Sequence, residues 1–270
     1  EYAPGVPATL DLDSTESVVD VADRAVARFA SRPAFSNLGR TISYGEFDVL
    51  NRRFATWLQS LPGVGPGDRV AIMLPNLLQY PVALFGVWRA GMVVVNVNPL
   101  YTPPELEHQL NDSGATVLIV LAQRAGAFAE IQARVGVRHV LVTGVGDLLG
   151  IPRGALVNLT MRYVRRLPVA DVPGAVGWSA VQNCKPEDFR QPSPSTGADL
   201  ACLQYTGGTT GRSRGAMLTH GNLVANIRQI NTWFAPRIVP GQEIMITPLP
   251  LYHVYALMCN CLCYVDVGGH

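Results

Sequence analysis

Only one lysine, Lys185, occurs among the 21 basic residues of this 270-residue chain. A Walker A loop places lysine directly after glycine and before Ser or Thr, so that loop is excluded here. Charged residues make up 15% of the sequence and the formal net charge is +1. So small a charge gives no indication of a nucleic-acid partner, and we expect none. The 48% hydrophobic content predicts a globular protein with a substantial core.

Cysteines are scarce, and they do not suggest a disulfide framework. They form an odd, clustered set in a chain that shows no signal peptide: Cys184, Cys202, Cys259, Cys261 and Cys263. This pattern favours a reducing compartment, and we expect a cytoplasmic protein. The last three lie in an apolar run without a C-x-x-C pair, so packing thiols are a better interpretation than metal ligands. We predict no metal-ligating side chains. The first residue is Glu rather than Met, and we expect the start to be trimmed.

One long apolar run could be mistaken for a membrane span. Residues 244–265 carry no formally charged side chain and are long enough to cross a bilayer. Pro248, Pro250, His253 and Asn260 interrupt the run, and flanking basic residues are absent. We therefore expect a buried strand followed by a helix of a soluble domain.

A second candidate for membrane contact is the amphipathic stretch 151–167. One face carries Leu156, Thr160, Tyr163 and Leu167, and the opposite face carries Arg162, Arg165 and Arg166. A basic amphipathic helix can lie on an anionic membrane, which leaves open a peripheral contact with the inner face of the cell membrane. A solvated surface helix is the favoured alternative because the run is short.

Apolar runs alternate with helical patterns along much of the chain. Helical spacing predicts helices over 15–30, 44–58 and 77–90, with a hairpin about Gly39. Thr102 followed by Pro103 is a typical helix start. Four apolar runs are predicted to be strands: 70–74, 92–97, 117–121 and 139–143. Continuous apolar strands between helices indicate a parallel sheet covered on both faces, hence an α/β fold.

We expect four parts in the chain. Residues 1–65 would form N-terminal helices and a hairpin, 66–170 a first α/β subdomain, and 171–198 a connector rich in Pro, Gly and Ser. Residues 199–270 would open a second α/β subdomain, with a strand at 201–205 and another at 263–270 that leads into a turn. The stretch 144–150 nearly matches a dinucleotide fingerprint, but its last glycine is one residue late, and we interpret it as a strand-exit turn.

The most informative stretch is 205–223, Tyr-Thr-Gly-Gly-Thr-Thr-Gly-Arg-Ser-Arg-Gly-Ala-Met-Leu-Thr-His-Gly-Asn-Leu. Its glycines permit positive φ angles and close approach to an anion. Its hydroxyls and the charges of Arg212 and Arg214 can complete an anion site. Apolar residues precede the stretch and a helical apolar pattern follows it, which argues against a flexible linker. We predict a loop whose successive N–H groups hold a polyphosphate.

This stretch resembles the phosphate loop of the adenylate-forming enzymes, and most closely that of the long-chain fatty-acid acyl-CoA synthetases. Residues 248–257, Pro-Leu-Pro-Leu-Tyr-His-Val-Tyr-Ala-Leu, resemble a second signature of that group, and 74–82, 96–103 and 111–114 resemble bacterial members. The resemblance implies the large N-terminal domain of that α/β fold. It also implies an activity: a fatty carboxylate attacks the α-phosphate of ATP, pyrophosphate leaves, and coenzyme A displaces AMP. Mg²⁺ would share the phosphate charge.

The resemblance also implies roles for individual residues. The β- and γ-phosphates would be held by Tyr205, Thr206, Gly207, Gly208, Thr209, Thr210 and Gly211. Arg214 stands where the family usually has Lys, so its charge is retained but its geometry differs. His253 would donate a hydrogen bond where the carboxylate meets the α-phosphate. The acyl chain would contact Tyr252, Val254, Leu257, Met258 and Cys261. Core packing is a comparable interpretation for the apolar members of this last set.

Two alternatives stay open. The substrate could be another carboxylic acid, or the chain could be a non-catalytic module that binds nucleotide or lipid; a homodimer is also left open. The family's later signatures, including the adenylation lysine, are absent from these 270 residues. We therefore expect that residues 1–270 alone make no acyl-CoA from ATP, palmitate and coenzyme A.

Overall fold

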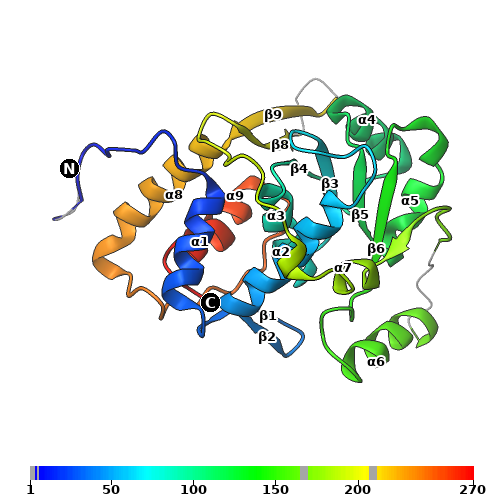
Figure 1. Cartoon of the computed structure of the whole chain (residues 1–270), viewed down its shortest axis with the longest axis horizontal. Helices are drawn as coiled ribbons and strands as arrows, with labels where there is room; N and C mark the ends of the chain where they lie inside the picture. The colour runs from blue at the N-terminus through cyan, green and yellow to red at the C-terminus, as the bar shows by residue number, and fades with distance from the viewer. Residues whose placement is uncertain (1–3, 5, 165–169, 207–211) are drawn as a thin grey trace.

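The computed structural model describes residues 4, 6–164, 170–206 and 212–270. Among these residues, the largest element is a seven-stranded sheet with the order β7-β6-β5-β3-β4-β8-β9, visible at the centre and right of Figure 1. Its strands are β3 (Arg69–Met73), β4 (Val93–Asn96), β5 (Val117–Leu121), β6 (His139–Thr143), β7 (Val176–Gly177), β8 (Leu200–Thr206) and β9 (Arg214–Thr219). A separate hairpin is formed by β1 (Pro33–Asn37) and β2 (Arg40–Ser43).

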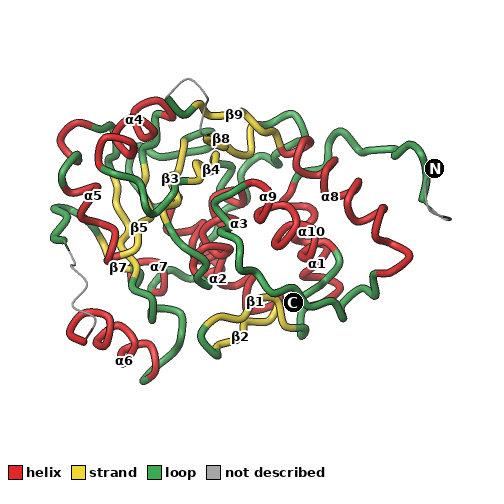
Figure 2. Tube along the Cα trace, turned by 180° about the vertical axis from the view of Figure 1, so that it is seen from behind, coloured by secondary structure: helices red, strands yellow, loops and turns green. Residues whose placement is uncertain are grey.

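Helices surround the sheet, and several are short. They are α1 (Val18–Phe29), α2 (Tyr44–Gln59), α3 (Gln79–Arg89), α4 (Pro103–Ser113), α5 (Ala125–Ala129), α6 (Arg153–Leu159), α7 (Ser179–Gln182), α8 (His220–Phe234), α9 (Val254–Ala256) and α10 (Cys263–Asp266). Between α9 and α10 the chain forms a π-helix over Leu257–Leu262. Figure 2 shows α1, α8, α9 and α10 gathered at one end of the molecule and α4 and α5 at the other.

The two faces of the sheet belong to two hydrophobic clusters. In β3, Ile72 packs in the cluster that includes residues of α1, α2 and α3, whereas Ala71 and Met73 pack with residues of α4 and α5. The same alternation occurs in β5. β3 pairs in parallel with both β4 and β5. Strands buried on both faces explain the continuous apolar runs in the sequence, and the predicted α/β fold is confirmed.

Local signals in the sequence predicted most elements to within a few residues. Thr102 caps α4, with Glu105 bonded back to the Thr102 backbone and Pro103 in the first turn. The hairpin about Gly39 is also confirmed. α1 begins at Val18, later than expected, because Ser17 and Asp20 form a capping box there. The stretch after β6 is the predicted turn: Gly144 N donates to Asp147 Oδ2 over 2.7 Å.

The strand predicted at 201–205 is present, but it belongs to a different sheet from the one expected. β8 pairs in parallel with β4, with Val94 opposite Cys202, and β9 pairs antiparallel with β8. The expectation was that this region would open a second sheet. Instead, β8 and β9 extend the sheet that 66–170 begins.

The C-terminal region differs from the sequence prediction in two places. Residues 243–249 form no strand, although His270 N donates to Glu243 O and Met245 N donates to His270 O. Residues 263–266 are helical rather than extended. The run 263–270 was predicted to be a strand, but α10 packs against α1 and α8, and Arg228 of α8 forms an ion pair with Asp266. Tertiary packing overrode local propensity here.

α6 continues as a π-helix over Thr160–Val164 and projects from the sheet in both views (Figures 1 and 2). Leu156 and Tyr163 are 64% and 62% exposed. The side chains that pack against the core are Val157 and Met161. The predicted apolar face is therefore exposed and does not pack against the core, and both interpretations of this helix, solvated or on a membrane, stay predictions.

Arg165, Arg166 and Leu167, which were predicted to belong to the same helix, lie outside the described residues. Within the part of the chain that is described, no helix combines the length and apolar character needed to span a membrane.

Candidate functional site

A cavity of about 440 Å³ opens where two neighbouring parallel strands, β4 and β8, reach their carboxyl ends. Its described lining comes from three segments: Asn96, Asn98 and Tyr101; Gln204, Tyr205 and Thr206; and Tyr252, His253, Val254 and Tyr255. Ligands of open α/β sheets bind outside the carboxyl ends of the strands. We call this space the site cavity. It brings together predicted residues from both the phosphate-loop motif and the Pro-Leu-Tyr-His motif.

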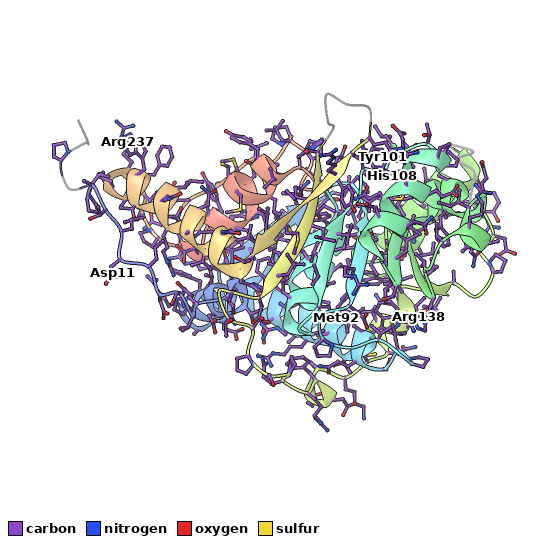
Figure 3. The ribbon with its side chains drawn as sticks, turned by 90° about the horizontal axis from the view of Figure 1, so that it is seen from above. Asp11, Met92, Tyr101, His108, Arg138 and Arg237 are labelled. Carbon is purple, nitrogen blue, oxygen red and sulfur yellow. The ribbon has the colours of Figure 1, made fainter. Side chains whose placement is uncertain are left out.

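The two arms of the β8–β9 hairpin are both attached to α4. The Tyr205 hydroxyl, on β8, donates to Asp112 Oδ2 over 2.6 Å. On the other arm, Nε2 of His108 lies 3.0 Å from Ser213 O, just before β9. Figure 3 labels Tyr101 and His108 near this end of the hairpin. Burial, and then the bond to Asp112 and its charge, raise the pKa of Tyr205, so its hydroxyl remains protonated.

Arg214 lies directly across the hairpin from Thr206, and both are exposed. The next pair, Tyr205 and Gly215, explains one glycine of the motif. A Cβ on Gly215 would lie 2.9 Å from the Tyr205 ring, so only glycine allows the ring to pack across the strand. The strand pairing therefore brings a cation and a hydroxyl to the same end of the hairpin.

The predicted phosphate-binding residues Gly207, Gly208, Thr209, Thr210 and Gly211 lie outside the described residues. Their role stays a prediction. The ends of their segment, Thr206 and Arg212, are described, and Thr206 lines the site cavity.

His253 lies at the start of α9 and is exposed at the site cavity. Its backbone N donates to Pro250 O over 3.0 Å in a turn. The rings of Tyr252 and His253 have centroids 4.6 Å apart and are tilted by 46°. An exposed imidazole at the carboxyl end of the sheet can donate a hydrogen bond to an anionic ligand.

The five predicted acyl-contacting residues do not line one surface. Tyr252 and Val254 line the site cavity. Leu257 and Met258 are buried in the core cluster that contains α1, α2 and α3. Cys261 lines a different cavity of about 300 Å³, next to the β1–β2 hairpin. Their proposed contact with an acyl chain stays a prediction.

The cysteine thiols have the properties of packing groups. Burial raises the pKa of Cys202, Cys261 and Cys263 to about 12 in each case. At neutral pH these thiols are protonated and are therefore poor nucleophiles. Among the described residues, no group of three or more His, Cys, Asp or Glu is placed to hold a metal ion.

The hydrogen-bonding role of a set of buried polar residues next to the site was not predicted from the sequence. Tyr80, Asn96 and Gln204 bond to one another and to the backbone around Tyr252. A signal was available, because Asn96 ends an apolar strand and Gln204 lies between Leu203 and Tyr205. Buried amides are normally hydrogen-bonded, but the sequence does not show to which partner.

Comparison with known proteins identifies the class. The family model described as "AMP-binding enzyme" matches residues 22–270. The chain belongs to this AMP-binding enzyme family. It is 47% identical over 270 residues to a long-chain-fatty-acid–CoA ligase of Escherichia coli O157:H7, covering 99% of this chain and 48% of that protein.

Solved structures agree on the fold. A long-chain-fatty-acid–CoA ligase from Archaeoglobus fulgidus superposes with a TM-score of 0.75 at 26% identity, over 100% of this chain and 49% of that one. ATP-bound MatB from Rhodopseudomonas palustris superposes with a TM-score of 0.72 over 94% of this chain and 44% of that one. Its identity of 24% supports the likeness of fold alone. The chain spans about half the length of the proteins it matches.

Proposed function

We propose that this chain belongs to an enzyme that activates a fatty acid with ATP and transfers the acyl group to coenzyme A. The observation that carries the proposal is the site cavity, where Thr206, Tyr252 and His253 meet at the carboxyl ends of β4 and β8. The close relative named a long-chain-fatty-acid–CoA ligase supports the substrate class. The reaction would release pyrophosphate and then AMP.

In this proposal the β8–β9 hairpin holds the polyphosphate. Thr206 and the residues after it would bind the β- and γ-phosphates, and Arg214 would add positive charge from the opposite strand. His253 would donate a hydrogen bond to the charge that develops on the α-phosphate. Alignment and charge stabilisation dominate such a transfer, so positioning of these groups is the main contribution of the protein.

Mg²⁺ would enter with ATP rather than occupy a protein cage. The described part of the chain offers the Thr206 hydroxyl at the cavity and no cluster of carboxylates. Magnesium commonly keeps several waters and binds through substrate phosphates with only one or two protein ligands. The Thr206 hydroxyl would help to hold the metal, which would neutralise part of the phosphate charge.

The test is pyrophosphate exchange into ATP, measured on the full-length product of the gene that carries this sequence. A panel would contain palmitate, shorter fatty acids, a branched acid and an aryl acid. We expect exchange with long-chain acids, and a large loss in His253→Ala. His139→Ala is the control, because His139 contacts Pro62 O and does not line the cavity.

Each result has a distinct meaning. Exchange with aryl or branched acids only would show that the substrate is another carboxylic acid and not a long-chain fatty acid. No exchange with any acid, in a protein that still binds ATP, would favour a non-catalytic nucleotide-binding module. Peripheral membrane contact and a homodimer stay predictions.

A further inference from the structure

The segment 247–252, which leads into His253, is held by side chains from elsewhere in the fold. It forms no helix or strand. Five of its backbone polar groups nevertheless bond to side chains: Thr247 O, Leu249 O, Leu251 N, Leu251 O and Tyr252 O. Backbone outside helices and strands has no hydrogen-bond ladder of its own, so these side chains satisfy its polar groups.

Asn76 holds the outer part of this segment. Its Nδ2 donates to Thr247 O over 3.0 Å and to Leu249 O over 2.9 Å. Its Oδ1 accepts from Leu251 N over 2.9 Å. One amide thus bonds three backbone groups and sets the path of the chain before Tyr252.

A second set of side chains holds the inner part, next to the site cavity. Gln204 Nε2 donates to Tyr252 O over 3.0 Å, and Asn96 Nδ2 donates to Gln204 Oε1 over 3.0 Å. The Tyr80 hydroxyl lies 2.7 Å from Asn96 Oδ1 and 2.8 Å from Leu251 O. Tyr80, Asn96 and Gln204 are at most 4% exposed. The three residues come from α3, β4 and β8, so the network joins the sheet to the segment before His253.

Donor counting fixes the direction of this network. A carbonyl only accepts, so the amide of Gln204 must turn Nε2 to Tyr252 O. Its Oε1 must then accept from Asn96, which leaves Asn96 Oδ1 facing Tyr80. Tyr80 has one hydroxyl proton for two acceptors, Asn96 Oδ1 and Leu251 O, and burial raises its pKa well above the usual value, so it keeps that proton. The amides of Gln204 and Asn96 therefore each have one orientation, whereas the single Tyr80 proton serves two acceptors.

We propose that Tyr80, Asn96 and Gln204 are positioning residues that hold Tyr252 and His253 toward the site cavity. The inference rests on the proposed function, since it concerns the use of His253. Tyr80 does not line the site cavity and acts through Leu251 O, while Asn96 and Gln204 reach the Tyr252 backbone from the cavity wall. Loss of the network would let His253 shift while leaving the sheet and the hairpin in place.

A tyrosine elsewhere in the fold provides a matched control. Tyr44 is as fully buried as Tyr80, and its hydroxyl also faces two acceptors, Gly269 O at 2.7 Å and Tyr264 O at 3.3 Å. Tyr80→Phe and Tyr44→Phe would be compared in the full-length gene product by thermal unfolding and by pyrophosphate exchange. We expect similar falls in Tm. Only Tyr80→Phe should lower kcat, by at least about tenfold, with little change in KM for ATP, because misplaced reacting groups lose rate.

A double-mutant cycle separates positioning from general damage. In a His253→Ala background, Tyr80→Phe should cause no further loss of kcat, because it acts through His253. If Tyr80→Phe does not fold, Gln204→Met takes its place, because it removes the other end of the network. We expect the same fall in kcat, and no further fall in the His253→Ala background.

Equal kcat values for Tyr80→Phe and Tyr44→Phe would overturn the positioning inference. So would a fall in kcat caused by Tyr80→Phe that is as large in the His253→Ala background as in the wild type. Wild-type turnover in His253→Ala alone is a different result. It would overturn the role proposed for His253 and the inference with it.

Discussion

The hydroxyl of Tyr205 on β8 donates a 2.6 Å hydrogen bond to Asp112 of α4, a residue 93 positions earlier in the sequence. The same helix contacts the other arm of the hairpin through His108 and Ser213 O. Both ends of the predicted phosphate loop are therefore tied to one helix on one face of the sheet.

Removing the Tyr205 hydroxyl should lower stability. Tyr205→Phe leaves Asp112 without this partner, and we expect the free energy of unfolding to fall by about 1 kcal/mol. Urea unfolding measures the change. Tyr163→Phe is the control, because Tyr163 is exposed on the π-helix after α6. Equal stability of the two variants would contradict a bond between Tyr205 and Asp112 in solution.

His220 should make stability depend on pH. Burial lowers its pKa from 6.5 to about 4, against the weaker opposing effects of Asp199 and Asp20. The unfolded chain therefore binds a proton near pH 6.5 that the folded chain does not bind until about pH 4. Stability from this residue is present above pH 6.5 and is lost as the pH falls toward 4, by up to about 3 kcal/mol.

The measurement for His220 is a difference, because carboxylates titrate in the same range. Free energies of unfolding of the wild type and of His220→Gln would be compared from pH 7.5 to pH 4. Glutamine can still accept the hydrogen bond that His220 Nδ1 receives from Val18 N. The free energy of unfolding of the wild type, relative to that of His220→Gln, should decrease as the pH falls. A difference that stays constant over this range would contradict the lowered pKa.

The phosphate loop gives a direct test of function. Thr209→Ala combined with Thr210→Ala should lower adenylate formation by roughly a hundredfold, as loss of preorganised polar contacts typically does. Pyrophosphate exchange in the full-length gene product measures this. Wild-type exchange in the double variant would reject these hydroxyls as phosphate ligands.

Substitutions of Arg214 test whether its positive charge or the shape of its guanidinium group matters for activity. Because it is exposed opposite Thr206, Arg214→Lys should keep most of the exchange activity and Arg214→Ala should lose it. Arg237→Ala, a change to an exposed arginine far from the hairpin in Figure 3, serves as the control. If Arg214→Ala matches that control, the side chain points to solvent.

Leu257 tests whether the acyl chain passes the buried π-helix. The resemblance alone predicts that Leu257→Trp lowers kcat/KM more for long acids than for short ones. In the structure, however, Leu257 is fully buried in the core cluster. We expect overpacking to cost about 1–3 kcal/mol in stability; a uniform loss of activity across chain lengths would then indicate a packing role alone. A selective loss for long acids in a stable variant would place Leu257 at the acyl path after all.

The sequence was informative wherever structure depends on local signals. The Thr102 cap and the apolar strands β3 to β6 were predicted closely, because caps and periodicity lie within a few residues. The pairing of β8 with β4 was not predictable, because the sequence of a strand does not show which other strand pairs with it. The helical path of 263–266 depends on contacts with α1 and α8, and the partners of Asn96 and Gln204 depend on the folded arrangement of three elements.

The distance in sequence between the parts of the site bears on how the protein folds. Asn96 and Gln204 are bonded across the β4–β8 pair but are 108 residues apart, and Gln204 bonds Tyr252 a further 48 residues along. Contacts of such separation form slowly, because the intervening chain must first be ordered. The helices and the β3–β4 unit can form early, while the site cavity must wait for the slowest pairing. In refolding, ligand binding should therefore return later than helical circular dichroism.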